Sequence, residues 1–90
     1  MDMIKTGRFL AELRKEHSLT QEQLGAELGV TNKTVSRWET GTYMPPVEIL
    51  QLLSVKYGVT INEILSGERL SEDNFKEKAE ENLRSALEDS

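Results

Sequence analysis

Apolar residues recur three or four positions apart along the first two thirds of the chain, which is the spacing of one buried face of an α-helix. The first stripe predicts a helix from about residue 3 to residue 17, and four further stripes follow it. Together they predict an all-α domain of five helices. The apolar positions, helix by helix, are Ile4, Phe9, Leu10 and Leu13; Leu24 and Leu28; Val35 and Trp38; Val47, Leu50, Leu53 and Tyr57; and Ile61, Ile64 and Leu65.

Polar residues and glycines mark the ends of these helices. Thr20 stands three residues before Gln23, the spacing of a capping box, in which each side chain accepts a hydrogen bond from the other residue's backbone. Gly29 follows the second stripe, where a left-handed residue usually ends a helix and glycine adopts that conformation without steric cost. Other predicted starts and stops are Thr31, Gly41, Pro46, Gly58 and the second capping box of Thr60 and Glu63.

The two short helices on either side of Gly29 are predicted to meet at a sharp turn. In the second of them, Val35 and Trp38 point toward the core. Side chains able to form hydrogen bonds lie on or near the opposite face, at Asn32, Lys33, Ser36 and Arg37. That face is free to bind an external partner.

The segment from residue 20 to residue 39 resembles the helix-turn-helix of the phage repressor and Cro family, often called XRE-type. The resemblance extends over roughly residues 4–67. It rests on the joint match of Gln21, Ala26, Gly29, Val35, Trp38, Glu39 and Gly41, with a proline after the motif and a helix before it. It implies that the second helix of the motif lies in the major groove of DNA.

The resemblance also implies which residues contact DNA. Asparagine can pair with adenine through two hydrogen bonds, arginine or lysine with guanine, and serine with several base edges. The expected base contacts are Asn32, Lys33, Ser36 and Arg37. Gln21 matches the family's phosphate-binding glutamine, and its place at a helix N-terminus also suits an anion. The weaker phosphate candidates are Thr34, Thr42 and Tyr43, whose hydroxyls stand close to the recognition helix.

In this family an arginine of the first helix pairs with a glutamate at the end of the recognition helix. Arg14 and Glu39 match those positions. Such a pair would fix the angle at which the recognition helix is presented, although its net effect on stability can be small.

The net charge of −5 is unusual for a DNA-binding protein, because phosphate neutralisation usually dominates affinity. Most of the acidity lies late in the chain: residues 1–66 hold seven Lys and Arg against eight Asp and Glu, whereas residues 67–90 hold four against eight. A basic face could still be formed by Lys5, Arg8, Lys33 and Arg37. We therefore expect weak non-specific DNA binding.

Composition limits the other classes of function. The chain has no cysteine, which excludes disulfides and thiolate metal sites, and we expect no metal and no cofactor. No apolar run approaches the roughly 20 residues needed to span a bilayer, and the N-terminus lacks a signal-peptide core. These features predict a cytoplasmic protein without membrane contact from this segment.

Residues 68–90 extend beyond the expected DNA-binding domain of residues 1–67. Apolar residues recur there every four positions among charged ones, which predicts an amphipathic helix from about residue 71 to residue 88. This acidic tail could pack on the domain, pair with a second copy, or form a linker in a longer protein. Its apolar positions are Phe75, Ala79, Leu83 and Leu87.

These observations predict a sequence-specific DNA-binding regulator that binds a palindromic operator as a homodimer. A repressor is favoured over an activator. The dimer could form only on DNA. The alternative is a protein-interaction or antitoxin-like module on a helix-turn-helix scaffold. No glycine-rich phosphate loop, metal cluster or nucleophile–base pair indicates an enzyme.

Overall fold

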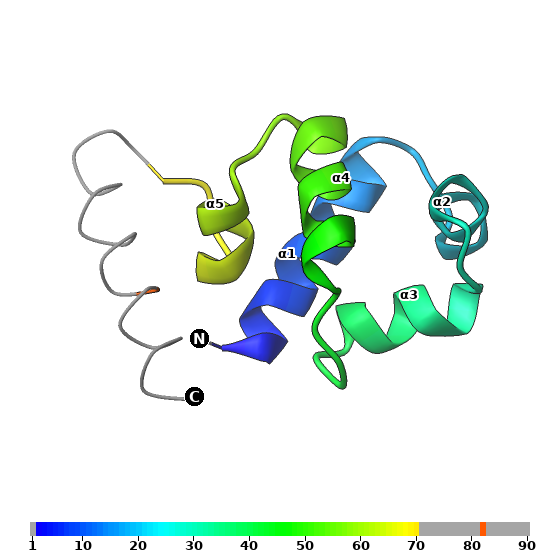
Figure 1. The fold of residues 1–90 in the computed structure, drawn as a ribbon, viewed down its shortest axis with the longest axis horizontal. Coiled ribbons are helices and arrows are strands. Elements are labelled where there is room, and N and C mark those ends of the chain that lie inside the picture. The colour runs from blue at the N-terminus through cyan, green and yellow to red at the C-terminus, as the bar shows by residue number, and fades with distance from the viewer. Residues whose placement is uncertain (1, 71–81, 83–90) are drawn as a thin grey trace.

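The computed structural model describes residues 2–70 and Asn82. In this part of the chain five α-helices follow one another: α1 (Met3–Glu16), α2 (Gln21–Leu28), α3 (Asn32–Glu39), α4 (Val47–Tyr57) and α5 (Ile61–Ser66). Figure 1 shows α1 and α4 crossing at the centre, with α2 and α3 at one end of the molecule and α5 at the other. The all-α prediction is confirmed.

The predicted helix ends agree closely with the structure. The Thr20 hydroxyl accepts a hydrogen bond from the Gln23 backbone N–H, and the Gln23 side chain accepts one from the Thr20 backbone N–H, at 3.0 and 2.9 Å. Thr60 and Glu63 form a second capping box of the same kind. Gly29 ends α2 with φ of +75°. Only α3 ends earlier than predicted, since Thr40 is its C-cap and Gly41 comes one residue later.

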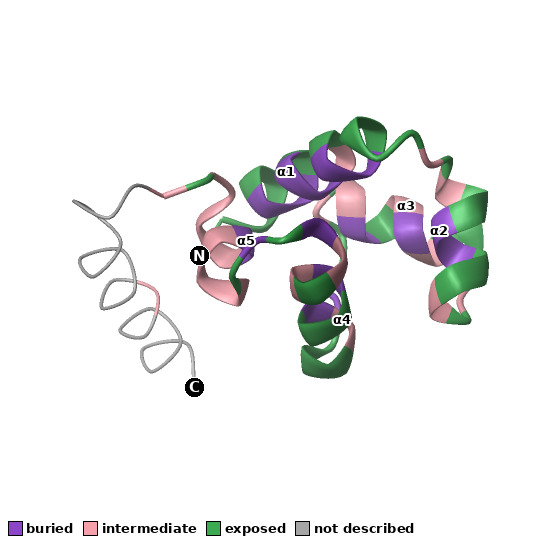
Figure 2. Ribbon diagram, turned by 90° about the horizontal axis from the view of Figure 1, so that it is seen from above, coloured by how far each residue is buried: buried purple, intermediate pink, exposed green. Residues whose placement is uncertain are grey.

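The core lies where the buried faces of the helices meet, as the purple faces in Figure 2 show. Two predicted core positions are wrong. Ile4 is 56% exposed and Val47 is 61% exposed, because each lies in the first turn of its helix, where the helix has not yet reached the core. The buried apolar residues are Phe9, Leu10, Leu13, Leu24, Val35, Trp38, Leu50, Leu53, Tyr57, Val59 and Ile64.

Two glycines let backbones approach each other closely around the helix-turn-helix. A Cβ on Gly7 of α1 would lie 2.5 Å from the Glu39 carbonyl oxygen of α3. A Cβ on Gly25 of α2 would lie 2.6 Å from the carbonyl oxygen of Val30, in the turn before α3. Glycine at these two positions therefore sets how closely α3 packs against α1 and how tightly the turn folds onto α2.

The chain remains attached to the domain after α5. Glu68 pairs with Lys5, and Arg69 pairs with Glu16 of α1 at 2.7 Å.

Burial opposes ionisation of Glu63, but hydrogen bonds from the backbone N–H groups of Thr60 and Leu70 outweigh it and hold the pKa of Glu63 below its ordinary value.

The tail helix predicted over residues 71–88 lies outside the described residues, except for Asn82. The side-chain amide of Asn82 donates hydrogen bonds to the Asn62 carbonyl oxygen and to the Ser66 hydroxyl of α5, at 3.2 and 2.8 Å.

The first prediction concerns the close contact at Gly25. Gly25→Ala should lower the free energy of unfolding by about 1–3 kcal/mol, because its methyl group would overlap a backbone carbonyl that cannot move without displacing α3. Urea denaturation followed by circular dichroism measures this. Gly29→Asn is the matched control in the same turn. No atom lies within 4 Å of a Cβ there, and asparagine tolerates a positive φ, so the free energy of unfolding should fall less in this variant. An unchanged midpoint for Gly25→Ala would contradict the assigned packing.

Candidate nucleic-acid interface

The polar face predicted for the recognition helix is present on α3. Val35 and Trp38 are buried, with Trp38 5% exposed, and they attach the helix to the core. Asn32, Lys33 and Arg37 are exposed on the other side, and Ser36 between them is half-buried. The structure thus brings the four expected base-contacting residues together on one helix, with Ser36 less exposed than the other three.

The start of α3 is fixed by two threonines. The Thr31 hydroxyl accepts a hydrogen bond from the Thr34 backbone N–H at 3.2 Å. The Thr31 and Thr34 hydroxyls are also 3.0 Å apart, within hydrogen-bonding distance. The hydroxyl of Thr34, a predicted phosphate ligand, therefore takes part in the helix cap as well.

The exposed face of α3 continues into a residue that the sequence analysis missed. Thr40 stands seven positions, or about two helical turns, after Lys33 and is exposed like it. Its hydroxyl donates to the Arg37 carbonyl oxygen at 3.3 Å and lies 2.9 Å from the Thr42 hydroxyl. The helical spacing from Lys33 could have indicated it. Thr40 thus links the recognition helix to the loop that holds Thr42 and the exposed Tyr43.

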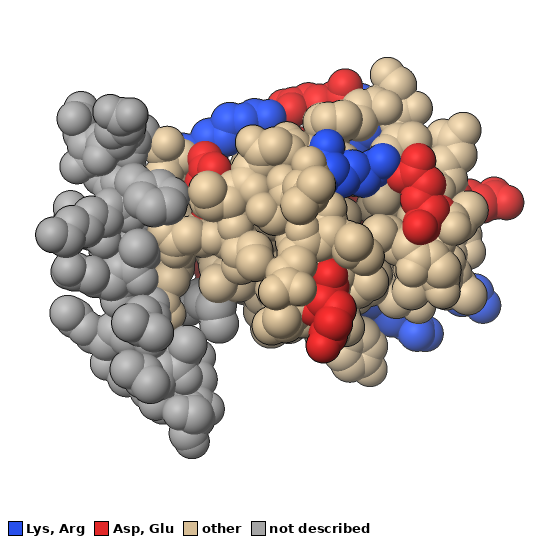
Figure 3. All heavy atoms as spheres, turned by 45° about the horizontal axis from the view of Figure 1, so that its top comes forward, with Lys and Arg blue, Asp and Glu red and all other residues tan. Residues whose placement is uncertain are grey.

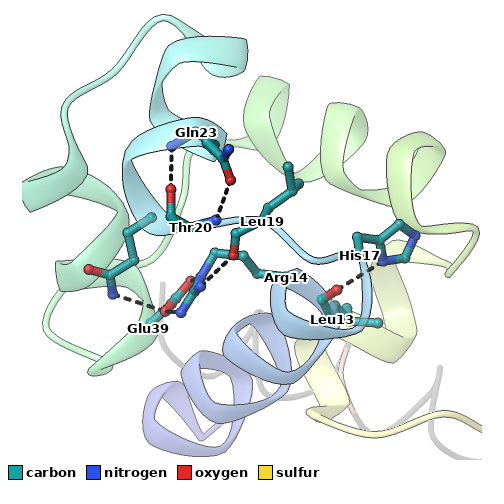
Figure 4. Close-up of polar contacts among 8 residues, drawn as sticks. Leu13, Arg14, His17, Leu19, Thr20, Gln23 and Glu39 are labelled. Carbon is teal, nitrogen blue, oxygen red and sulfur yellow. Dashed lines mark hydrogen bonds and ion pairs between the residues drawn. The ribbon is translucent and has the colours of Figure 1, made fainter.

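A buried ion pair holds the end of α3 against α1, as Figure 4 shows. Arg14 donates through Nε to Oε2 of Glu39 at 2.7 Å and through Nη2 to Oε1 at 2.9 Å. Its third donor, Nη1, reaches the Leu19 carbonyl oxygen at 2.7 Å. The Arg14 and Glu39 side chains are only 11% and 7% exposed. The hydrogen bonds to Glu39 raise the pKa of Arg14, so the pair implied by the family resemblance is charged and fully engaged.

Gln21 joins the same network. Its side-chain amide donates to Oε1 of Glu39 at 3.1 Å, which ties the first residue of α2 to the last residue of α3. One amide hydrogen and the amide oxygen remain for an external partner. Gln21 therefore holds the geometry of the motif, and its expected role as a phosphate ligand stays a prediction.

An aromatic pair lies on the outer side of this network. The Tyr57 and His17 ring centroids are 4.8 Å apart. Burial, followed by the nearby Glu39 charge, raises the pKa of Tyr57 to about 12. The Tyr57 hydroxyl thus stays neutral and adds no negative charge beside the Arg14 and Glu39 pair.

The basic face expected from four residues is only partly formed. Lys33 and Arg37 are exposed on α3, but Lys5 lies 3.2 Å from a Glu68 carboxylate oxygen, which offsets its charge. Figure 3 shows Lys and Arg side chains in separate groups, with Asp and Glu between them, on the face that it presents.

Among the described residues, no group of three or more His, Cys, Asp or Glu side chains could hold a metal ion. None of the described helices is long and apolar enough to cross a membrane.

A tight turn between two short helices, followed by a polar face on the second helix, defines the helix-turn-helix class. The sequence profile of the helix-turn-helix family matches residues 10–64, which include α2, the turn and α3. The chain belongs to this family, of the XRE type, as its resemblance to phage repressors predicted.

Several characterised regulators are similar to this chain. The transcriptional activator BcrR of Enterococcus faecalis is 46% identical over 61 residues, which are 68% of this chain and 30% of BcrR. The phage CTXphi transcriptional repressor RstR of Vibrio cholerae is 36% identical over 75 residues, 83% of this chain and 65% of RstR. The antitoxin PezA of Streptococcus pneumoniae is 28% identical over 64 residues, 71% of this chain and 40% of PezA.

The chain spans about a third of BcrR and just under two thirds of RstR. No solved structure matches the chain at a comparable level of significance.

The second prediction tests the ion pair by a double-mutant cycle. Arg14→Met and Glu39→Gln should each lower the free energy of unfolding by about 3–5 kcal/mol, because each change leaves a buried charge without its partner. The double variant Arg14→Met/Glu39→Gln should lose clearly less free energy of unfolding than the sum of the two single losses. Chemical denaturation of the four proteins measures the coupling. Strictly additive losses would mean that the two side chains do not depend on each other.

Proposed function

We propose that this protein is a transcriptional regulator that binds a specific DNA sequence by placing α3 in the major groove. The observation that supports this most directly is the position of Asn32, Lys33 and Arg37, which are exposed together on the second helix of a helix-turn-helix motif. The similarity to BcrR and RstR, an activator and a repressor of transcription, supports the same function. Such a protein would act in the cytoplasm, without enzymatic chemistry.

Each exposed residue of α3 has a distinct capacity for reading bases. The Arg37 guanidinium can donate two hydrogen bonds to O6 and N7 of guanine, and the Asn32 amide can pair with N6 and N7 of adenine. Lys33 offers a mobile cation for guanine, and the Ser36 hydroxyl can donate or accept at the edge of the helix. Because α3 has only eight residues, one copy contacts only a few base pairs.

Contacts to the DNA backbone would position this helix. We assign them to residues at both ends of the motif: Gln21 at the start of α2, Thr34 in the first turn of α3, and Thr42 and Tyr43 in the loop after α3. Hydroxyl and amide groups of this kind fix register on the duplex without reading sequence. Tyr43 is 60% exposed and reaches solvent freely.

A short recognition helix favours a symmetric operator read by two copies. The homodimer would place its two α3 helices in successive major grooves, so the half-site centres should be about 34–36 Å apart. Occupying such a site would repress transcription wherever it overlaps the start of a gene. Dimerisation could occur only on DNA, because neighbouring half-sites would hold two copies at a high effective concentration.

A second candidate function is a protein-interaction role like that of an antitoxin. The similarity to PezA favours it, and the same scaffold could then use part of its surface to hold a partner protein. Weak DNA binding at physiological salt combined with tight binding of a partner would distinguish this function from the first.

The third prediction concerns base reading, on an operator selected from a random DNA pool. Arg37→Ala and Asn32→Ala should each weaken specific binding by about 1–3 kcal/mol and relax the preference at one base position, because each removes a two-bond contact to a base. Lys15→Ala removes an exposed charge from α1 and serves as the control; it should leave the preference intact. Fluorescence anisotropy with single-base operator variants measures both effects. An unchanged base preference in both α3 variants would contradict the placement of α3 in the major groove.

The fourth prediction concerns assembly through the tail, whose apolar stripe requires a partner surface. Replacing Phe75 and Leu83 by Ser should reduce dimerisation at least about tenfold, which corresponds to 1.4 kcal/mol. Sedimentation equilibrium with and without operator measures it. Replacing Lys76 and Arg84 by Ser is the control on the polar positions of the same segment. Association unchanged by the apolar replacements in both conditions would mean that the tail packs on its own domain or forms a linker and does not join two copies.

A further inference from the structure

A groove of about 540 Å³ runs between α3 and the start of α4, beside the proposed DNA-binding face. Its apolar surface comes from Val30 in the turn before α3, Trp38 of α3, and Pro46 and Ile49 at the start of α4. This volume lies in the range of protein pockets that hold small molecules. The groove is therefore large enough for a ligand of the size of a metabolite.

Two side chains of opposite charge line the same groove. Arg37 lies on the α3 side and Glu48 on the α4 side, and both are exposed. Among the described residues they form no ion pair with each other or with any neighbour, although four other ion pairs occur there. The groove thus combines an apolar surface with one cation and one anion that are not neutralised within the described part of the chain.

We propose that this groove binds a free α-amino acid with an apolar side chain. The α-carboxylate would pair with Arg37, which is suited to planar two-bond recognition of a carboxylate. The α-ammonium would pair with Glu48, and the apolar side chain would cover Trp38 and Ile49. A ligand with only one charge would pair with only one of the two exposed side chains and would lose the other ion pair.

Binding in the groove would also regulate the proposed function, on which this second step rests. Arg37 and Thr34 line the groove and also belong to the proposed DNA-binding face, and Tyr43 lies at the same edge. A carboxylate held by Arg37 would withdraw its guanidinium from guanine. The amino acid would therefore act as an inducer that lowers affinity for the operator.

The first experiment uses Trp38 as a reporter, because the chain has a single tryptophan and it lines the groove. The full chain without DNA is titrated with L-leucine and L-phenylalanine. The matched probes are glycine, which lacks the apolar group, 3-phenylpropionate, which lacks the ammonium, and 2-phenylethylamine, which lacks the carboxylate. We expect a saturable change of Trp38 fluorescence with at least one of the two amino acids, and at least about tenfold weaker binding of every matched probe.

Variants then locate the site. Glu48→Gln should weaken binding of the amino acid at least about tenfold, whereas Glu22→Gln, which removes an exposed carboxylate from α2 outside the groove, should leave it unchanged. Both substitutions are at exposed positions, and circular dichroism verifies that the variants are folded. The absence of any saturable change up to about 10 mM, a concentration well above typical metabolite affinities, would overturn the proposal. Equal binding of the single-charge probes, or no effect of Glu48→Gln, would overturn it as well.

The second experiment separates ligand binding from DNA binding. The affinity for the selected operator is measured at increasing concentrations of the amino acid, in the wild type and in Glu48→Gln. We expect loss of operator affinity in the wild type only. If the amino acid binds and the operator affinity stays constant, the inducer role is overturned; if no operator is found at all, the proposed function fails while the fluorescence result stands.

Discussion

The orientation of the recognition helix depends on one interaction, the two-bond pair between Arg14 and Glu39. It joins α1 to the last residue of α3, and the third donor of Arg14 holds the loop between α1 and α2 through the Leu19 carbonyl. Gln21 adds the start of α2 to the same carboxylate. The guanidinium thus holds α3 and the loop after α1, and the Glu39 carboxylate holds the start of α2. The planar set of donors on Arg14 fixes angles as well as distances. Lysine could not replace it, because an ammonium group does not define a plane.

Backbone packing supports the same arrangement from the other side. Gly7 lies directly against the Glu39 carbonyl, and Gly25 lies against the turn before α3. The backbone contacts set a minimum distance by steric repulsion, whereas the ion pair fixes the orientation of the two side chains. Together they fix the position of α3 relative to the core, so the backbone that carries its exposed side chains is preorganised and little backbone entropy remains to be lost on binding.

Local sequence was enough to predict much of this structure. The capping boxes at Thr20 and Thr60 and the left-handed Gly29 are decided within a few residues, so their outcome agreed with prediction. Ile4 and Val47 have the correct helical spacing yet are exposed, because periodicity does not reveal where along a helix the core begins. The bond of Gln21 to Glu39 and the approach of Arg37 and Glu48 to one groove bring together residues of different helices, so they depend on the tertiary fold. The assignment of individual residues to bases and phosphates needs the DNA itself.

Because the Arg14 and Glu39 pair is buried, added salt affects the fold and the exposed charges of α3 to different degrees. Mobile ions screen exposed charges over distances of about 10 Å at 0.1 M ionic strength, but they screen buried pairs much less. The Arg14 and Glu39 side chains are nearly excluded from solvent, whereas Lys33 and Arg37 are exposed to it. Rising ionic strength therefore acts on the exposed charges of α3 and leaves the buried pair that orients this helix almost unaffected. Under the proposed function, the salt dependence of DNA binding would consequently report the exposed charges that meet DNA rather than a loosening of the fold.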